Sequence, residues 1–229
     1  AADLTAGTVT YKSVAAGDEL ILTSAQATGV AIAAATNANA VITVEALAAD
    51  ANLTNIGNAT ATVNVRVNEN IDASGNTTVT NVDKYTIAAG NTLTLAAATV
   101  TAKTVDGAGT LIINALAADT NLGSVNPGGG VTANVAASFD ASGNGNLTNV
   151  TGYAIATGNT LQLTADQVTG KTVSGEGTLT LTAAASAGET DFSAVSVDVF
   201  DVSAANLTAG TVTYKSVAAG DELILTSAQ

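Results

Sequence analysis

The sequence predicts an all-β fold, a parallel β-solenoid (β-helix) of stacked coils, and three observations lead to that prediction. Apolar and polar residues alternate in short runs, similar runs recur along the chain, and one long stretch occurs twice. Alternation with a period of two is typical of β-strands, because successive side chains point to opposite faces. A recurring strand that cannot bury its own apolar face is expected to stack on its neighbours.

The expected strands are short runs separated by turn-forming clusters. Leu-x-Leu pairs mark four of them, at 20–22, 93–95, 161–163 and 179–181. Thr is common at the intervening positions, where it suits the outer face of a strand. The clusters between the runs include AAGN, ATGN, DGAG, SGEG and NPGGG, which favour turns. Leu163 and Leu181 lie 18 residues apart, as do Leu95 and Ile113, and we expect a coil of about that length.

One stretch of 23 residues, LTAGTVTYKSVAAGDELILTSAQ, occurs without a difference at 4–26 and at 207–229. Its two copies are offset by 203 residues, and Asp3 before the first copy faces Asn206 before the second. This mismatch at the edge of the copy favours a natural tandem array over a copied cloning cassette, and deliberate engineering stays open as the alternative. The chain contains no Met, so we expect it to be a processed piece of a longer protein.

Shorter repeats divide this period. Three related segments, at 11–29, 84–102 and 152–170, align on the anchor glycines Gly17, Gly90 and Gly158, and Gly220 is the next anchor. The steps between successive anchors become shorter along the chain, from 73 to 68 and then to 62. We therefore predict repeat modules at 1–81, 82–149 and 150–206, and the start of the next period at 207–229.

A string of small β-sandwich modules is the alternative fold. The predicted modules are short for independent sandwiches, which typically need about 100 residues. Aromatic residues make up only 3% of the chain, and small aliphatic side chains suit the narrow interior of a solenoid.

Charge and residue types exclude several functions. The net charge of −13 disfavours nucleic acid, which needs a basic surface, and nothing indicates membrane insertion. The chain has no His and no Cys, so it lacks the usual bases, nucleophiles and zinc ligands, and we expect no enzyme activity. The acidic pair Asp18 and Glu19 is interpreted as a solvated turn. A polysaccharide-cleaving β-helix stays a remote alternative.

The segments LTADQVTGKTVSGEGTLTLT (163–182) and LAAATVTAKTVDGAGTLIIN (95–114) resemble the strand-rich tandem repeats of large bacterial surface proteins, which include repetitive adhesins, S-layer-like proteins and secreted repeat proteins. The resemblance implies export, an extracellular or cell-surface location, and a role in a stalk, fibre, adhesive array or biofilm matrix. Such proteins are often loaded with calcium. This sequence departs from the calcium-binding β-roll repeats, because their glycine-aspartate nonapeptide is not present.

Two DASGN motifs, at 72–76 and 140–144, are the candidate cofactor sites. Asp72 and Asn76 in the first, and Asp140 and Asn144 in the second, supply hard oxygen atoms on a tight turn, as calcium requires. The alternative is a plain Asx turn, which we favour, and no other cofactor is expected.

We predict a structural extracellular protein that forms a fibre, stalk or surface layer by end-to-end continuation of the solenoid. Its partner is then itself, either head to tail or as a covalent tandem array. The alternative is an adhesin segment that binds a cell-surface glycan or protein. Such a segment would be expected to carry a loop insertion, and the one near 34–38 consists of Ala, Asn and Thr, which make a poor hot spot. Thr-x-Thr pairs leave an ice-binding solenoid as a remote alternative.

Overall fold

A computed structural model of the chain describes residues 11–12, 19–33, 40–56, 61–183, 190–205, 207, 212–214 and 220–226. The fold is all-β: parallel strands stack as successive coils of a β-solenoid of about nine turns. This confirms the predicted fold class, and the sandwich alternative is wrong. The Cα atoms cluster into two compact units, unit 1 (1–112 and 124–130) and unit 2 (113–123 and 131–229). The two units do not follow the three predicted modules, which remain a prediction from the repeats.

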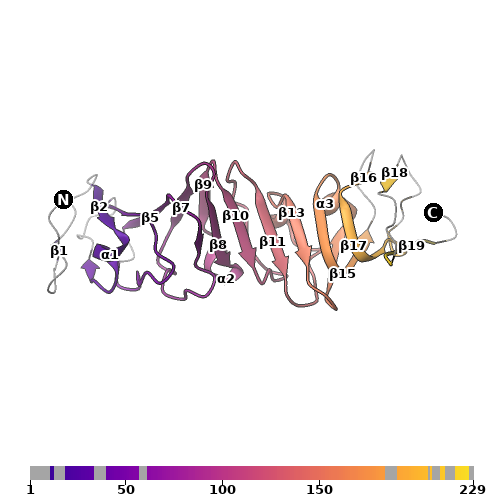
Figure 1. Cartoon of the computed structure of the whole chain (residues 1–229), viewed down its shortest axis with the longest axis horizontal. Coiled ribbons are helices and arrows are strands. Elements are labelled where there is room, and N and C mark those ends of the chain that lie inside the picture. The colour runs from indigo at the N-terminus through magenta and orange to yellow at the C-terminus, as the bar shows by residue number, and fades with distance from the viewer. Residues whose placement is uncertain are drawn as a thin grey trace. The chain divides into compact units, whose positions relative to one another are not determined.

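Unit 1 is built on a five-stranded parallel sheet (Figure 1). Its strands lie in the order β2 (Glu19–Thr23), β4 (Val41–Glu45), β5 (Thr62–Val67), β7 (Lys84–Ile87) and β9 (Thr104–Gly107). Two further parallel pairs are β6 (Ile71–Asp72) with β8 (Thr92–Ala96), and β1 (Tyr11–Lys12) with β3 (Ile32–Ala33). Two four-residue helices complete it, α1 (Ser24–Ala27) and α2 (Ala97–Val100).

Unit 2 is also built of parallel strands, but one of its strands, β15, continues through a corner where unit 1 has two separate strands. The long strand β15 (Thr172–Ala183) pairs through its first part with β13 (Gly152–Ile155) and through its second part with β14 (Thr160–Thr164). The remaining strands are β11 (Val131–Val135), β12 (Phe139–Asp140), β16 (Thr190–Phe192), β17 (Val195–Asp201), β18 (Val212–Tyr214) and β19 (Glu222–Ile224). Its helices are α3 (Ala165–Val168) and the 3-10 turn η1 (Gly145–Leu147). The strand β10 (Thr110–Asn114) spans the boundary between the two units.

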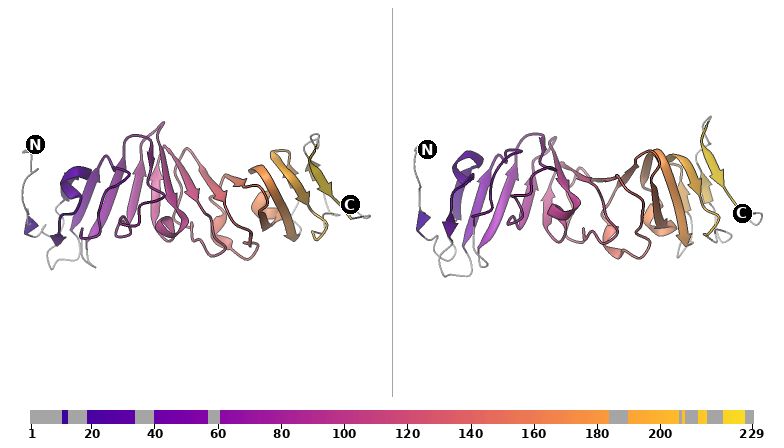
Figure 2. Two further views of the ribbon diagram at one scale, coloured as in Figure 1. Left: turned by 60° about the horizontal axis from the view of Figure 1, so that its bottom comes forward. Right: turned by 90° about the horizontal axis from the view of Figure 1, so that it is seen from below.

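Equivalent apolar side chains stack one above another inside each unit, and Figure 2 shows their strands as successive rungs. In unit 1 the register places Leu22, Val44, Val65, Tyr85 and Val105 in one column. All five are buried. The steps between successive members of this column, 22, then 21, then 20 and again 20, are the coil lengths. Most coils are therefore longer than the sequence predicts.

The predicted spacing holds in one coil of unit 2. Leu163 lies beside Leu181 in the register of β14 and β15, and both are fully buried. The following coils lengthen, because Leu179 faces Phe200, a step of 21, and Phe200 faces Leu223, a step of 23. The sequence therefore locates the strands more accurately than it fixes the length of each coil.

The clusters DGAG and SGEG are not open turns. Gly107 ends β9 and Gly175 lies within β15, with φ angles of 96° and 110°. A Cβ atom at either position would lie 2.1 Å from a backbone oxygen of the coil before, that of Ile87 or Ile155. Glycine is thus required twice over at these corners, for its positive φ and for the close approach of two coils.

Equivalent strands of successive modules lie in different sheets of unit 1. β2 follows the anchor Gly17 and belongs to the five-stranded sheet, whereas β8 follows the anchor Gly90 and pairs with β6. Three coils of this sheet, from Leu22 to Tyr85, cover 63 residues of the chain, whereas Gly17 and Gly90 are 73 residues apart. The segment between these two anchors therefore extends part of the way round a further coil, and β8 lies on another side of the solenoid than β2.

Candidate functional site

The two DASGN motifs form equivalent turns, one in each unit. In unit 1 the backbone amide and the hydroxyl of Ser74 donate to Oδ1 of Asp72, at 3.0 and 2.6 Å. These bonds hold the pKa of the Asp72 carboxyl below its usual value, because they stabilise its charged form. In unit 2 Ser142 lowers the pKa of Asp140 in the same way. Both turns are the Asx turns that the sequence predicts as the alternative to a metal site.

The asparagine that ends each motif joins two coils. The side-chain amide of Asn76 donates to the backbone oxygens of Ala49 and Ala51, at 3.0 and 2.8 Å. That of Asn144 donates to Ala118 and Thr120, at 2.9 Å each. Asn76 Oδ1 accepts from the amide and hydroxyl of Thr78, and Asn144 Oδ1 accepts from the amide of Asn146. These side-chain amides donate hydrogen bonds to backbone carbonyls that lie outside the strand pairing. Their role is therefore structural.

An open groove of about 410 Å³ lies beside the first motif, and its lining includes the carboxylates of Asp50 and Asp72. Two carboxylates fall short of the six to eight oxygen ligands that calcium takes. Among the residues that the structure describes, no group of three or more carboxylate, imidazole or thiolate side chains lies close enough to hold a metal. Calcium at Asp72, Asn76, Asp140 and Asn144 stays a prediction.

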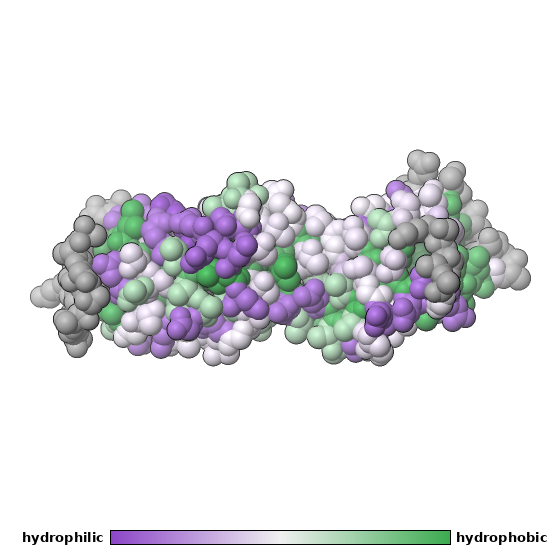
Figure 3. All heavy atoms as spheres, in the orientation of Figure 1, coloured by the Kyte–Doolittle hydropathy of each residue, from purple (hydrophilic) through white to green (hydrophobic). Residues whose placement is uncertain are grey.

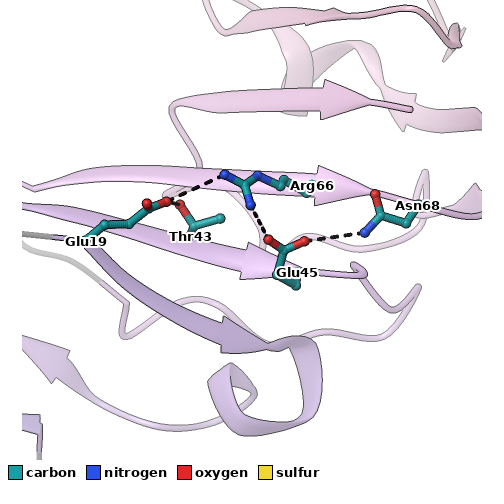
Figure 4. Close-up of polar contacts among 5 residues, drawn as sticks. All are labelled: Glu19, Thr43, Glu45, Arg66 and Asn68. Atoms are coloured by element: carbon teal, nitrogen blue, oxygen red, sulfur yellow. Dashed lines mark hydrogen bonds and ion pairs between the residues drawn. The ribbon is translucent and has the colours of Figure 1, made fainter. Parts of the chain in front are cut away.

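A ladder of charged and polar side chains crosses the outer face of β2, β4 and β5 (Figure 4). The guanidinium of Arg66, the only arginine of the chain, contacts the carboxylate of Glu45 on the adjacent strand and that of Glu19, 3.8 Å away, two strands along. Glu19 also accepts a hydrogen bond from Thr43, and Glu45 one from Asn68. The acidic pair Asp18 and Glu19 was expected in a solvated turn, but Glu19 begins β2 and pairs with Arg66; Asp18 lies outside the described residues.

Hydrophilic side chains gather over β5 and β7, in the orientation of Figure 1 (Figure 3). Lys84 on β7 and Asp106 on β9 form a further ion pair, with Nζ and Oδ2 2.6 Å apart. Burial raises the pKa of Asp106, but the hydrogen bonds from Lys84 and Thr86 outweigh it, so the pKa of this carboxyl lies below its usual value. Arg66 and Lys84 thus pair with carboxylates of neighbouring coils, whereas Lys103 and Lys171 donate to backbone carbonyls.

Sequence reasoning missed the helical turns that follow β2 and β14. Thr23 and Thr164 cap α1 and α3, each in a reciprocal pair with a glutamine three residues later, Gln26 or Gln167. The T-x-x-Q spacing is the signal that could have found them. Gln167 also donates to the backbone oxygens of Ala141 and Asn144, both at 2.9 Å, so this cap joins neighbouring coils.

The outer face of the described strands β14, β15 and β17 does not repeat threonine from strand to strand. Thr160 and Thr178 lie side by side in β14 and β15. At the next outward position, successive strands place Gln162, Thr180 and Asp201. This irregular row gives ice binding no support. The insertion near 34–38 falls outside the described residues, and so do three threonines of the Thr-x-Thr pairs Thr8/Thr10 and Thr211/Thr213, namely Thr8, Thr10 and Thr211.

None of the described helices has the length and hydropathy of a transmembrane span. No family model matches the chain, and neither a curated protein nor a solved structure matches it. The features that bear on function are therefore those of the chain itself, namely stacked parallel coils, side chains that join them, and the repeated sequence of β2 and β19.

Proposed function

We propose that this protein is a structural, extracellular repeat protein that forms a fibre, stalk or surface layer by end-to-end continuation of its solenoid. One observation carries the proposal: β2 and β19, near opposite ends of the sequence, share the residues Glu-Leu-Ile within the 23-residue repeat. A parallel solenoid grows by adding one coil to the edge of the last, and such an edge is a template for further strands.

The chemistry of the described surface supports a mechanical role over a catalytic one. The polar side chains with the most partners, such as Asn76, Asn144 and Gln167, bond to backbone carbonyls of neighbouring coils. A head-to-tail contact of this kind does not close on itself, and such contacts produce filaments. A covalent tandem array of the 203-residue period would extend the same column of coils.

Electron microscopy of the purified chain, together with light scattering on a sizing column, tests the proposal. We expect fibres or end-to-end oligomers that grow longer with protein concentration. Fibre diffraction should show a meridional spacing of about 4.8 Å, the distance between stacked strands. Particles of a single size at all concentrations, with and without calcium, would contradict the proposal. Repeating the measurement with a chelator tests the predicted calcium sites at the same time.

A further inference from the structure

Four Asn-x-Thr triplets lie in the part of the chain that the structure describes, and they begin at Asn52, Asn76, Asn146 and Asn149. Such a triplet is the acceptor of N-linked glycosylation where it lies on a surface loop of a secreted protein. Two further triplets begin at positions 58 and 206, outside the described residues. A chain rich in Asn and Thr contains such triplets by chance, and the contacts of each asparagine distinguish them.

The side-chain amides of Asn76 and Asn149 already join coils. Asn76 Nδ2 donates to two backbone oxygens of a neighbouring coil, and Asn149 Nδ2 donates to those of Leu122 and Gly123, at 3.3 and 3.4 Å. Glycosylation replaces one hydrogen of this nitrogen with a sugar, so at least one of the two hydrogen bonds would be lost at each site. We therefore expect neither asparagine to be glycosylated in the folded chain.

The triplet of Asn146 is exposed but lies in a helical turn. Asn146 belongs to η1, and Thr148 continues the turn with φ and ψ of −58° and −34°. Side chains two positions apart on a helix do not face each other, so an enzyme that contacts the Asn146 amide does not reach the Thr148 hydroxyl from the same side. Lys171 also holds this turn, since its Nζ donates to the backbone oxygens of Leu147 and Thr148.

The triplet of Asn52 presents both of its polar side chains to solvent. Asn52 and Thr54 are exposed, Leu53 between them is fully buried, and none of the three belongs to a helix or strand. The backbone amide of Thr54 donates to Asn52 Oδ1, at 3.2 Å, so the asparagine side chain is turned towards Thr54. Asn52 Nδ2 donates no hydrogen bond within the described residues. This nitrogen is therefore accessible without breaking any contact between coils.

The open groove of unit 1 provides space for a sugar on Asn52. Its volume is about 410 Å³, and its lining includes Asn52 together with Asp50, Asp72 and Thr77. Sites that bind small molecules measure about 300–1,000 Å³. Carboxylate and hydroxyl oxygens accept hydrogen bonds, which the hydroxyl groups of a sugar can donate. A glycan on Asn52 thus meets polar side chains and displaces none of the core.

We infer that Asn52 is an N-glycosylation site: of the described triplets, it is the one that the folded chain presents to an oligosaccharyl transferase. The inference rests on the proposed function, since glycans of this kind are attached to exported proteins. In the reaction Asn52 Nδ2 forms a bond to the anomeric carbon of a sugar, and the bond from that carbon to the pyrophosphate of a lipid-linked oligosaccharide breaks. The amide loses one proton, and the lipid pyrophosphate leaves with the bonding electron pair.

Peptide mapping by mass spectrometry tests which triplet is used. The full chain with Asn58→Gln and Asn206→Gln, which leaves the four described triplets, is incubated with a purified oligosaccharyl transferase and a lipid-linked oligosaccharide. We expect Asn52 to be modified at least about tenfold faster than Asn76 and Asn149, because their two hydrogen bonds must first open. Tryptic peptides of the same chain, incubated in the same way, are the control, and there the difference should disappear. Equal rates in the folded chain would overturn the inference.

Two variants of Thr54 test whether the exposed triplet itself is recognised. Thr54→Ala removes the hydroxyl that the acceptor motif requires, whereas Thr54→Ser keeps it. Since Thr54 is exposed, both chains should fold, which circular dichroism checks. We expect Thr54→Ala to abolish the modification of Asn52 and Thr54→Ser to retain it. A glycan on Asn52 in the Thr54→Ala chain would contradict the assignment of the triplet as the site.

Protein isolated from the cells that produce it separates this inference from the proposed function. We expect its peptides to carry a glycan at Asn52 and none at Asn76 or Asn149. Fibres of a chain whose Asn52 is unmodified would overturn the inference and leave the proposed function standing. A chain that is glycosylated at Asn52 but stays monomeric at all concentrations would overturn the proposed function and support the glycosylation site.

Discussion

Units 1 and 2 stack similar coils and share the asparagine bridges of the DASGN turns, but they differ in other side chains that join the coils. In unit 1, ion pairs cross the outer face of the sheet, from Arg66 to Glu45 and from Lys84 to Asp106. In unit 2, three aromatic rings pack together, with Phe192 and Phe200 edge to face at 5.2 Å and Tyr214 within 5.8 Å of Phe192. What both units share is the column of buried aliphatic residues and the glycine corner. The coil thus tolerates charged pairs on its outer face in one unit and aromatic packing in its interior in the other, while its glycine corners recur.

The glycine corners give the largest expected effect, and it should be the same in both units. Gly107→Ala and Gly175→Ala each add a Cβ atom 2.1 Å from a backbone oxygen. We expect each to lower the free energy of unfolding by about 3–5 kcal/mol, from steric overlap and positive φ together. Urea denaturation followed by circular dichroism measures the loss.

The matched controls for this prediction are Gly90→Ala and Gly158→Ala. These anchors also have positive φ, at 79° and 76°, but a Cβ atom there meets nothing within 4 Å. We expect these two substitutions to lower the free energy of unfolding by only about 1–2 kcal/mol, which is the cost of the left-handed conformation. Equal losses in the two pairs of variants would show that the close approach of coils is not what requires Gly107 and Gly175.

We expect the aromatic cluster to stabilise unit 2 and to have no effect on the stability of unit 1. Phe192→Ala leaves a cavity beside Phe200 and Tyr214, and we expect a loss of about 3–4 kcal/mol; Phe192→Leu, which fills most of that space, should lose about 1 kcal/mol. Hydrogen exchange by mass spectrometry should show faster exchange in 190–201 and little change in 62–67. Equal acceleration in both segments would show that the two units unfold as one, and the contrast between them would fail.

The Arg66 ion pairs should contribute less, and salt should weaken them. The side chain of Arg66 is 47% exposed, and exposed pairs contribute about 0–1 kcal/mol. We expect Arg66→Gln to lower the free energy of unfolding by about 0.5–1 kcal/mol in dilute buffer. In about 1 M NaCl, where charges are screened within about 3 Å, we expect almost no change. Lys103→Gln removes a cation that donates to the Thr80 carbonyl, so its loss should depend less on salt. A salt-independent loss for Arg66→Gln would contradict the ion-pair ladder.

The sequence predicts the interior of this fold better than its sites. Alternation of apolar residues identifies strands such as 93–95 and 161–163, because one face must be buried whatever covers it. The coil length was predicted less well, since turns between strands absorb a few extra residues without disturbing the register, as between Leu179, Phe200 and Leu223. The ion pair between Glu19 and Arg66 could not be predicted, because it joins residues two coils apart and depends on the registers of both.

The motifs that suggest a metal site show why spacing alone does not decide between two roles. Asp72 and Asn76 are spaced as calcium ligands are, but the same spacing also forms an Asx turn and an amide bridge to the next coil. Spacing alone cannot separate the two, because both use carboxylate and amide oxygens on a tight turn. The coil-to-coil bonds of Asn76 and Asn144 become visible only once the neighbouring carbonyls are placed.

The smallest effect concerns pH and the Lys84–Asp106 pair. Because the pKa of Asp106 in the folded chain lies below its usual value, the carboxylate stabilises the fold above the pKa of the unfolded chain, near 3.9. That stabilisation is lost as the pH falls through the lower, folded-state pKa. Asp106→Asn should therefore lower the free energy of unfolding at pH 7, by less than about 1 kcal/mol for a half-exposed pair, and should match the parent chain near pH 2.

Urea denaturation of the parent chain and of Asp106→Asn between pH 2 and pH 7 gives the measurement. Thr86→Val is the intermediate control, since it removes one of the two hydrogen bonds to Asp106 and keeps Lys84. The free energy of unfolding of Thr86→Val should depend on pH less than that of the parent chain and more than that of Asp106→Asn. If the difference between Asp106→Asn and the parent chain were instead constant with pH, the side chain would contribute by packing and not by its charge. The ion pairs would then not distinguish unit 1 from unit 2, and only the aromatic cluster would.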